Sequence, residues 1–490
     1  MNKLKLTAIS IALLLIGNIN MCSMRPEGSS VSTTIDNIYL LIERGEYTEA
    51  TESIQALIEA GQVNDTEKQD LLFQVERMDR IRKDFDQTRE EVVEYLKGFY
   101  PELTDEDMTR WEQEKSLECK VIDGEKWYFA RAGRNLFRID KGMRELWKQL
   151  HPDAGLTSGS GAGLDLDKHN MEIIETAISE DKMFVHPKRL RIKQSIKVKP
   201  DMVPEGELLK CWIPYPRYIP NRQVDIKLIA SWPEKHIIAP ESALQRTIYF
   251  EAPAQQGEFT EFMVEYEMTS HGVYVNIDPE QVLPTPDDPE LKPFLAERLP
   301  HIQFTDDLKR LSEELVGDET NPYRIAQKLF AWVDENTPWA SAREYSTIQC
   351  IPQYALENGH GDCGIQTLQF MTLCRMNGIP TRWQSGWELQ PPNDSMHDWG
   401  MIYFHPYGWV PMDATYGLRD SEDQRLRWFY LSGMDSYRII YNDDFSQPFT
   451  PPKTHFRSET VDSQRGEVEW SEGNLYFDQW RWSHEWEVLE

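Results

Sequence analysis

The chain has 490 residues, of which 40% are hydrophobic, so it is long enough for several domains with their own cores. It carries 82 acidic against 52 basic residues, a formal net charge of −30. Such a surface repels phosphate backbones, and no basic aromatic patch opposes this, which excludes a nucleic-acid-binding function.

The N-terminus predicts export. Lys3 and Lys5 precede an apolar run over 6–17 that is too short to span a membrane comfortably, so residues 1–22 are expected to form a signal peptide. The run ends at Cys22, which resembles the lipidated cysteine of bacterial lipoproteins, although Asn20 and Met21 depart from the usual small residues. We expect a periplasmic or cell-surface protein attached to the membrane only through a lipid at Cys22. The alternative is an ordinary signal peptide.

Residues 30–150 are expected to form a helical domain. An Ala/Ile/Leu pattern spans Tyr47–Ala60, and Thr104 with Asp107 makes a capping-box start. Asp123-Gly124 lies between two short apolar segments and predicts a hairpin turn. Residues 151–168 include a Gly/Ser-rich run that predicts a linker.

Alternating apolar residues at 190–198, 224–228 and 264–268 predict short strands, so 169–290 is expected to be a β-sandwich. Asn321-Pro322 begins a helix in a mixed α+β domain at 300–450. The Trp-rich residues 451–490 are expected to form a β extension that rejoins an earlier domain, with a stacking platform for glycans as the alternative. The predicted fold class is therefore multidomain α+β.

Cys363 has the context of a nucleophile. It lies in Gly361-Asp362-Cys363-Gly364, before a helical pattern that stops at Asn377-Gly378-Ile379-Pro380. In the first turn of a helix, free N–H groups and the helix dipole favour thiolate and lower a pKa that starts near ~8.5. The N–H of Cys363 can donate to an oxyanion. The alternative is that Cys363 is only a small buried hydrophobic residue, which is our interpretation of Cys374.

His397 and Asp413 lie on two predicted strands joined by a turn at 405–408. In a hairpin of this size their side chains can lie near one another, so His397 is expected to act as the base for Cys363 and Asp413 as its orienting carboxylate. The alternatives are a structural histidine and a turn aspartate. A zinc site made of these three residues lacks a close-spaced ligand pair, so we expect no metal and no cofactor.

The motifs Gly-Asp-Cys-Gly, His397-x-Trp399 and Trp409-x-x-x-Asp413-Ala414-Thr415 together resemble the transglutaminase-like superfamily. The resemblance covers about 320–445. It implies a papain-like core with a Cys363-His397-Asp413 triad and a second oxyanion donor on an upstream aromatic residue, for which Trp339 is the candidate and Trp332 the weaker alternative. The segment 433–438 also resembles the end of bacterial versions.

We therefore expect a peptidase or amidase, or a protein-glutamine acyltransferase, acting through a thioester at Cys363, with hydrolysis favoured over cross-linking. The expected partners are a peptide or protein substrate and a cell-envelope glycan or peptide. The alternative is an inactive scaffold that binds peptide or glycan. Five cysteines follow Cys22, so in an oxidising compartment at least one thiol is unpaired within the chain.

Overall fold

A computed structural model describes residues 30–152 and 163–489. The predicted signal peptide, Cys22 and most of the Gly/Ser-rich run of the linker lie outside the described residues. The chain divides between Leu72 and Phe73 into two compact units, which are described separately. Within the described ranges, no helix combines the length and apolar character of a membrane span.

The first unit is helical. It contains α1 (Ser30–Arg44), α2 (Tyr47–Glu59) and the start of α3 (Asp65–Asp84). Helix α2 buries Tyr47, Ala50, Ile54 and Leu57, whose spacing of three and four residues puts them on one face. The helix predicted at Tyr47–Ala60 is confirmed.

The second unit begins with the rest of α3 and more helices. These are α4 (Arg89–Lys97), α5 (Asp105–Gln113), α6 (Ala132–Ile139) and α7 (Lys141–Leu150), with a hairpin of β1 (Cys119–Ile122) and β2 (Glu125–Tyr128) between α5 and α6. The hairpin and the Thr104–Asp107 capping box are confirmed. Asp123 and Gly124 both have positive φ, as a two-residue turn of this type requires.

Two five-stranded antiparallel sheets form the next part of this unit. Their strands from the central part of the chain are β3 (Phe184–Val198), β4 (Leu208–Pro214), β5 (Gln223–Trp232), β6 (His236–Ile238), β7 (Thr247–Pro253) and β8 (Thr260–Tyr274). One sheet has the order β12 (Gly433–Met434), β8, β3 and β16 (Trp480–Leu489), with β5 also paired to β8. The other has the order β15 (Gly473–Leu475), β14 (Glu467–Trp470), β4, β7 and β6. The strands predicted at 190–198, 224–228 and 264–268 are confirmed.

Neither sheet is made by residues 169–290 alone. The C-terminal strands β14 (Glu467–Trp470) and β16 (Trp480–Leu489) pair with β4 and β3, and β12 (Gly433–Met434) pairs with β8. The short β15 (Gly473–Leu475) completes the second sheet. The segment predicted as sandwich also opens with a helix, α8 (Leu166–Glu180), which starts inside the predicted linker. Periodicity reports local structure, and pairing between strands so far apart in the sequence leaves no local signal.

The third part is a four-stranded antiparallel sheet with helices. The sheet has the order β11 (Gly408–Met412), β10 (Ser395–Phe404), β9 (Thr381–Glu388) and β13 (Arg438–Asn442). The helices are α9 (Asp306–Val316), α10 (Pro322–Asn336), α11 (Ile351–Asn358), α12 (Cys363–Met376) and the short α13 (Gln424–Arg427). Asn321 caps α10 with bonds to the N–H groups of Tyr323 and Arg324, so that predicted helix start is confirmed.

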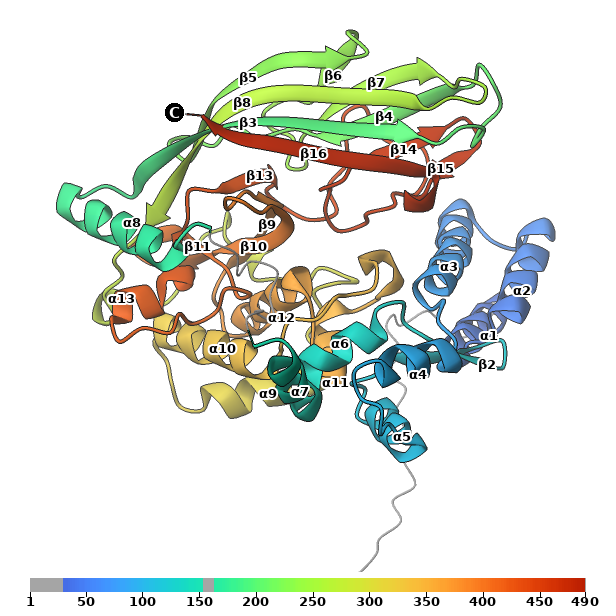
Figure 1. The fold of residues 1–490 in the computed structure, drawn as a ribbon, viewed down its shortest axis with the longest axis horizontal. Coiled ribbons are helices and arrows are strands. Elements are labelled where there is room, and N and C mark those ends of the chain that lie inside the picture. The colour runs from blue at the N-terminus through green and yellow to red at the C-terminus, as the bar shows by residue number, and fades with distance from the viewer. Residues whose placement is uncertain (1–29, 153–162, 490) are drawn as a thin grey trace, which may run out of the picture. The chain divides into compact units, whose positions relative to one another are not determined.

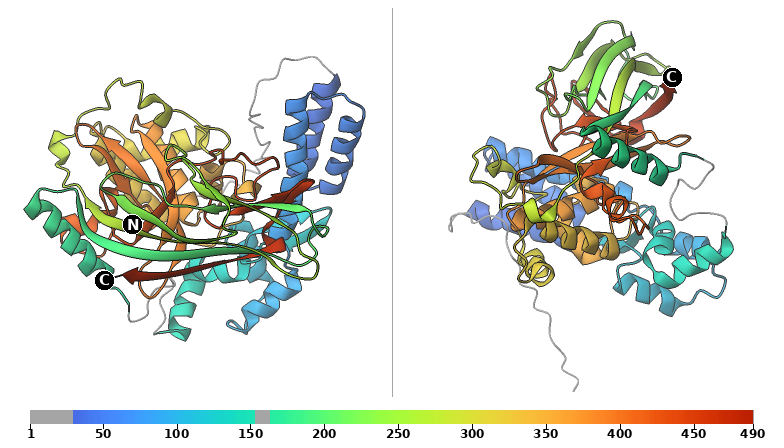
Figure 2. Two further views of the ribbon diagram at one scale, coloured as in Figure 1. Left: turned by 90° about the horizontal axis from the view of Figure 1, so that it is seen from above. Right: turned by 90° about the vertical axis from the view of Figure 1, so that its left-hand side faces the viewer.

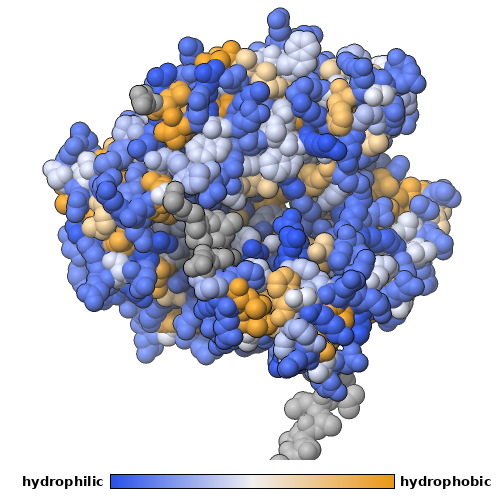
Figure 3. All heavy atoms as spheres, in the orientation of Figure 1, coloured by the Kyte–Doolittle hydropathy of each residue, from blue (hydrophilic) through white to orange (hydrophobic). Residues whose placement is uncertain are grey.

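Helix α12 lies at the centre of this part, and nearly all of its residues are buried. It shares a core with Trp383 and Ile402 of the sheet, whereas Trp387, Ile439 and Tyr441 contribute to the core of the sandwich. The sheet thus lies between the helices and the sandwich strands (Figures 1 and 2). The face drawn in Figure 3 is mainly hydrophilic with small separate hydrophobic patches, in keeping with the composition.

Candidate active site

Cys363 is the first residue of α12, and its surroundings fix the start of this helix. The side chain of Asp362 accepts a hydrogen bond from the N–H of Ile365 at 3.2 Å, which is an N-cap. A Cβ on Gly364 would collide with the hydroxyl of Tyr345, so the position requires glycine. The cysteine is partly exposed, while Gly364 to Arg375 of the helix are buried. Cys363 therefore has the helix-start position that the sequence predicts.

The partner of the Cys363 thiol is Asp398. The Sγ atom donates to Oδ2 of Asp398 at 3.3 Å, and the hydroxyl of Tyr345 donates to the same oxygen at 3.1 Å. Gln464 from the C-terminal segment donates to the other carboxylate oxygen at 2.8 Å. Burial raises the pKa of Asp398 to about 7, with the charge of Asp362 as a further cause. Asp398 is thus a titratable group in direct contact with the thiol.

Burial also raises the pKa of the Cys363 thiol well above its ordinary value, and the charges of Asp398 and Asp362 add to the effect. The expectation of a lowered thiol pKa is therefore wrong for this environment. The helix dipole is present, but its effect of about 1 kcal/mol is smaller than the cost of placing a thiolate beside two carboxylates away from water.

His397 and Asp413 form a buried pair. The imidazole Nε2 lies 2.8 Å from Oδ2 of Asp413, and both side chains are at most 5% exposed. The N–H groups of Thr415 and Tyr416 donate to the other carboxylate oxygen. The contact with Asp413 therefore holds Nε2 of the imidazole, and Nδ1 is not part of this pair.

Arg438 of β13 contacts the same oxygen of Asp413 as His397 does. Its Nη1 is 2.9 Å from Oδ2 of Asp413, and its Nε donates to Asp435 at 2.9 Å. The guanidinium is fully buried, with Glu388 as a third, more distant carboxylate. Burial alone would raise the pKa of Asp413, but the neighbouring His397 and Arg438 reverse this and lower it. Asp413 is therefore ionised in the native protein.

The predicted site residues are partly brought together. His397 and Asp413 are paired, and Trp339 lies beside Gly361, two residues before the cysteine. Within residues 163–489, the thiol of Cys363 makes its hydrogen bond with Asp398 and none with His397. The roles of Cys363, His397, Asp413 and Trp339 in a reaction remain predictions.

Sequence reasoning missed Asp398 and the role of Arg438. Asp398 directly follows His397, and successive side chains of a strand point to opposite faces. Residue spacing therefore does not predict that Asp398 contacts the Cys363 thiol. The sequence signal for Arg438 was a positive charge among the apolar residues of 437–441. Such a charge is expected to be buried, and a buried cation needs carboxylate partners.

We expect Asp398→Asn to make Cys363 more reactive. The variant removes a negative charge that opposes thiolate formation, so carbamidomethylation of Cys363 by iodoacetamide should be about tenfold faster at pH 8. Asp398 is protonated below its pKa of about 7, so the two proteins should differ little at pH 5.5. The rate is followed by mass spectrometry of the peptide that contains Cys363.

Asp287→Asn is the control for this experiment, because Asp287 is an exposed carboxylate paired with Lys292. An Asp398→Asn rate that equals or falls below the wild-type rate at pH 8 would show that this carboxylate does not raise the thiol pKa.

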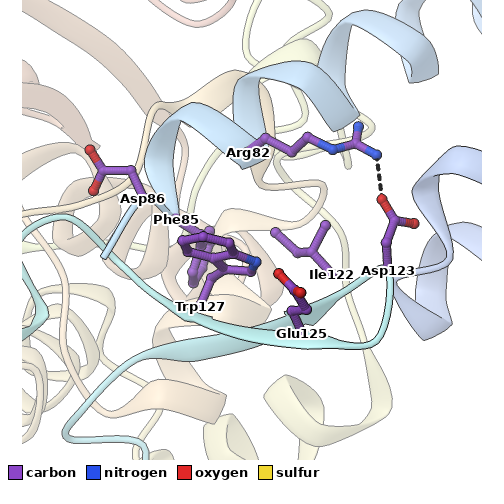
Figure 4. Close-up of a pocket in the computed structure, with 7 residues that line it drawn as sticks. All are labelled: Arg82, Phe85, Asp86, Ile122, Asp123, Glu125 and Trp127. Atoms are coloured by element: carbon purple, nitrogen blue, oxygen red, sulfur yellow. Dashed lines mark hydrogen bonds and ion pairs between the residues drawn. The ribbon is translucent and has the colours of Figure 1, made fainter. Parts of the chain in front are cut away.

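A pocket of the described residues lies elsewhere, in the helical part of the second unit (Figure 4). It has a volume of about 560 Å³ and contains an ion pair of 2.7 Å between Arg82 and Asp123. Its lining consists of Arg82, Phe85, Asp86, Ile122, Asp123, Glu125 and Trp127. None of these is a candidate catalytic residue.

The second unit is an α+β structure in which a cysteine at a helix N-terminus occurs with a buried His–Asp pair on a neighbouring hairpin. Residues 309–414 match the family model of the transglutaminase-like superfamily, so this segment is a transglutaminase-like core. The matched residues include Trp339, Cys363, His397 and Asp413.

Two solved structures are similar to parts of the chain. One, from Cytophaga hutchinsonii and provisionally assigned as a cysteine protease, has 17% identity and a TM-score of 0.42, covering 63% of this chain and 92% of that one. The other is the periplasmic domain of TgpA from Pseudomonas aeruginosa, with 13% identity and a TM-score of 0.25, covering 52% of this chain and 92% of that one. No curated protein matches the chain.

Proposed function

We propose that this protein is an exported cysteine enzyme that cleaves or transfers acyl groups from peptide or glutamine-type amides through a thioester at Cys363. The observation that carries the proposal is the buried 2.8 Å pair of His397 and Asp413 in the same family-matched segment as a partly exposed cysteine at a helix start. The apolar N-terminal run and Cys22 support export and a lipid anchor.

Acylation begins when the Cys363 sulfur attacks the amide carbonyl carbon. The thiol proton passes to Nδ1 of His397, and the N–H of Cys363, with Trp339 as the further candidate donor, stabilises the oxyanion. The imidazolium then protonates the leaving amine, and the C–N bond breaks to give the thioester. The Asp413 carboxylate stabilises the imidazolium throughout.

Deacylation uses the same residues in reverse. His397 removes a proton from water or from an acceptor amine, which attacks the thioester carbonyl and returns the thiol. Water gives a peptidase or amidase, and a lysine amine gives a cross-linker. We favour hydrolysis, because water is the acceptor in excess in a dilute extracytoplasmic setting.

A second candidate function is a scaffold that binds peptide or glycan without turnover. The hydrogen bond from the Cys363 thiol to Asp398 favours it, since a thiol held by a carboxylate is a poor nucleophile. For the enzyme to act, the thiol must exchange this partner for His397.

The test is to trap the thioester. Full-length protein is incubated with a library of peptides and glutamine-containing peptides, quenched in acid, and analysed by intact mass and by mapping of the peptide that contains Cys363. We expect an acyl adduct on Cys363 that is lost by hydrolysis in water. If the protein also cross-links, a lysine-like amine should make the loss of the adduct faster. Binding of peptides with no adduct under any condition would support the scaffold.

A further inference from the structure

Helix α6 and the residue before it provide three arginines that have no carboxylate partner among the described residues. Arg131 precedes its first residue, Arg134 lies within it, and Arg138 lies near its end. Arg131 and Arg134 are exposed, and Arg138 is partly buried. Over the described ranges 30–152 and 163–489, none of the three lies within ion-pair distance of an acidic side chain. In a chain with 82 acidic residues, an unpaired arginine group needs an explanation.

Helix α6 is fixed to the loop that follows α10. The side chain of Asn135 donates to the carbonyl of Ser341 at 2.8 Å and accepts from its N–H at 3.0 Å. Both residues are buried, so this paired hydrogen bond holds the helix and the loop in register. Arg138 adds a contact of 3.4 Å to the hydroxyl of Ser341.

Arg138 thereby lies over the ring of Trp339, with its Cζ 4.5 Å from the ring centroid. Trp339 pairs with Gly361 in a parallel bridge, and hydrogen bonds on both sides of Trp339 reach Gly361. With about 4.8 Å between paired strands and about 3.8 Å between consecutive Cα atoms, Trp339 lies within about 12 Å of Cys363. A substrate bound at Cys363 is within a few residues' reach of α6.

Among residues 30–152 and 163–489, the guanidinium of Arg138 has no carboxylate partner. It has five N–H donors, and its described hydrogen bond uses one of them. Burial lowers its pKa, and the positive charges of Arg131 and Arg134 lower it further. A bound anion would offset the neighbouring positive charges.

We propose that Arg138, with Arg134, forms a subsite for a carboxylate of the acyl-donor peptide, a few residues from the reacting carbonyl. The inference rests on the proposed function. Arginine binds carboxylates through two parallel hydrogen bonds, which fixes the orientation as well as the charge of the substrate.

The test compares matched peptides on the full-length protein. One peptide carries a glutamate two to four residues from the reacting amide and its match carries glutamine, and a second pair differs by a free or amidated C-terminus. We expect wild-type kcat/KM to be about tenfold or more higher for a carboxylate peptide, and the pair that shows the difference identifies the carboxylate source. Arg138→Gln should bring the ratio close to one.

Two further variants separate recognition from packing on Trp339. Arg134→Gln keeps the contact of Arg138 with the indole, yet it should reduce the ratio of kcat/KM between the carboxylate and neutral peptides. Arg138→Lys should restore part of the ratio that Arg138→Gln loses. Arg189→Gln is the control, since Arg189 is an exposed arginine paired with Glu267 on β3. No carboxylate preference in the wild type, or a preference that survives in Arg138→Gln and Arg134→Gln, would overturn the subsite.

The same subsite can be tested if the protein turns over no peptide. Binding of the four peptides to Cys363→Ala protein is then measured by calorimetry, with and without Arg138→Gln. Tighter binding of a carboxylate peptide that Arg138→Gln abolishes supports the subsite although the proposed chemistry has failed. Equal binding of carboxylate and neutral peptides overturns it.

Discussion

Cys363→Ala should abolish acyl-enzyme formation and reduce turnover by about 10⁴-fold or more, because it removes the atom that forms the thioester. His397→Ala should be nearly as damaging. Asp413→Asn should cost about 10³-fold, since the imidazole loses its fixed tautomer while the nucleophile and the oxyanion donors stay. The measurement is kcat/KM on whichever substrate forms the thioester.

The double variant of Cys363→Ala and His397→Ala should cost little more than Cys363→Ala alone, because the two residues act as one unit. Cys374→Ala is the matched control, for Cys374 is a buried cysteine in the same helix, eleven residues further on. It should leave an acyl adduct on Cys363. Full turnover by Cys363→Ala would show that the activity does not use this cysteine.

Local features of this fold could be predicted from the sequence. The start and end of the helix at Cys363 follow from Asp362 and Asn377-Gly378, and the hairpin of His397 follows from alternation around a turn. These features are determined by interactions between neighbouring residues, namely helix capping and the two-residue period of a strand.

Non-local features could not be predicted. The pairing of β16 with β3, from Trp480 opposite Val198 to Leu489 opposite Arg189, joins strands about three hundred residues apart. The contact of Cys363 with Asp398 depends on where the start of α12 packs against β10, and Gln464 reaches the same carboxylate from the C-terminal segment. Such contacts follow from tertiary packing. The helix dipole alone predicts a lowered pKa for the Cys363 thiol, whereas burial and the neighbouring carboxylates raise it.

Arg438→Met should destabilise the protein by about 3–5 kcal/mol at pH 7, because it leaves Asp413 and Asp435 buried without their cation. In the native protein the pKa values of both carboxyls are lowered despite burial, with Arg438 among the causes for each. Their ionised forms therefore contribute stability above their unfolded pKa, and this contribution is lost as the pH falls through the folded values.

The pH dependence separates this effect from lost packing. In Arg438→Met the two carboxyls can relieve their burial only by taking up protons, so the difference from the wild type in urea unfolding should narrow as the pH falls from 7 towards 4. Arg375→Met is the matched control. Arg375 is also a buried arginine of this core, but it donates to the carbonyls of Ala296 and Thr381 and to the Thr381 hydroxyl. The difference in unfolding free energy between Arg375→Met and the wild type should not become smaller as the pH falls.

Arg438→Lys distinguishes charge from geometry at the same position. Lysine keeps the positive charge, but it cannot offer the planar fork that contacts Asp413 and Asp435 together. It should recover part of the stability at pH 7 while His397-dependent turnover stays reduced, because Asp413 would be less firmly placed against the imidazole. A stable Arg438→Met protein with wild-type turnover would instead mean that His397 alone keeps Asp413 ionised and in position.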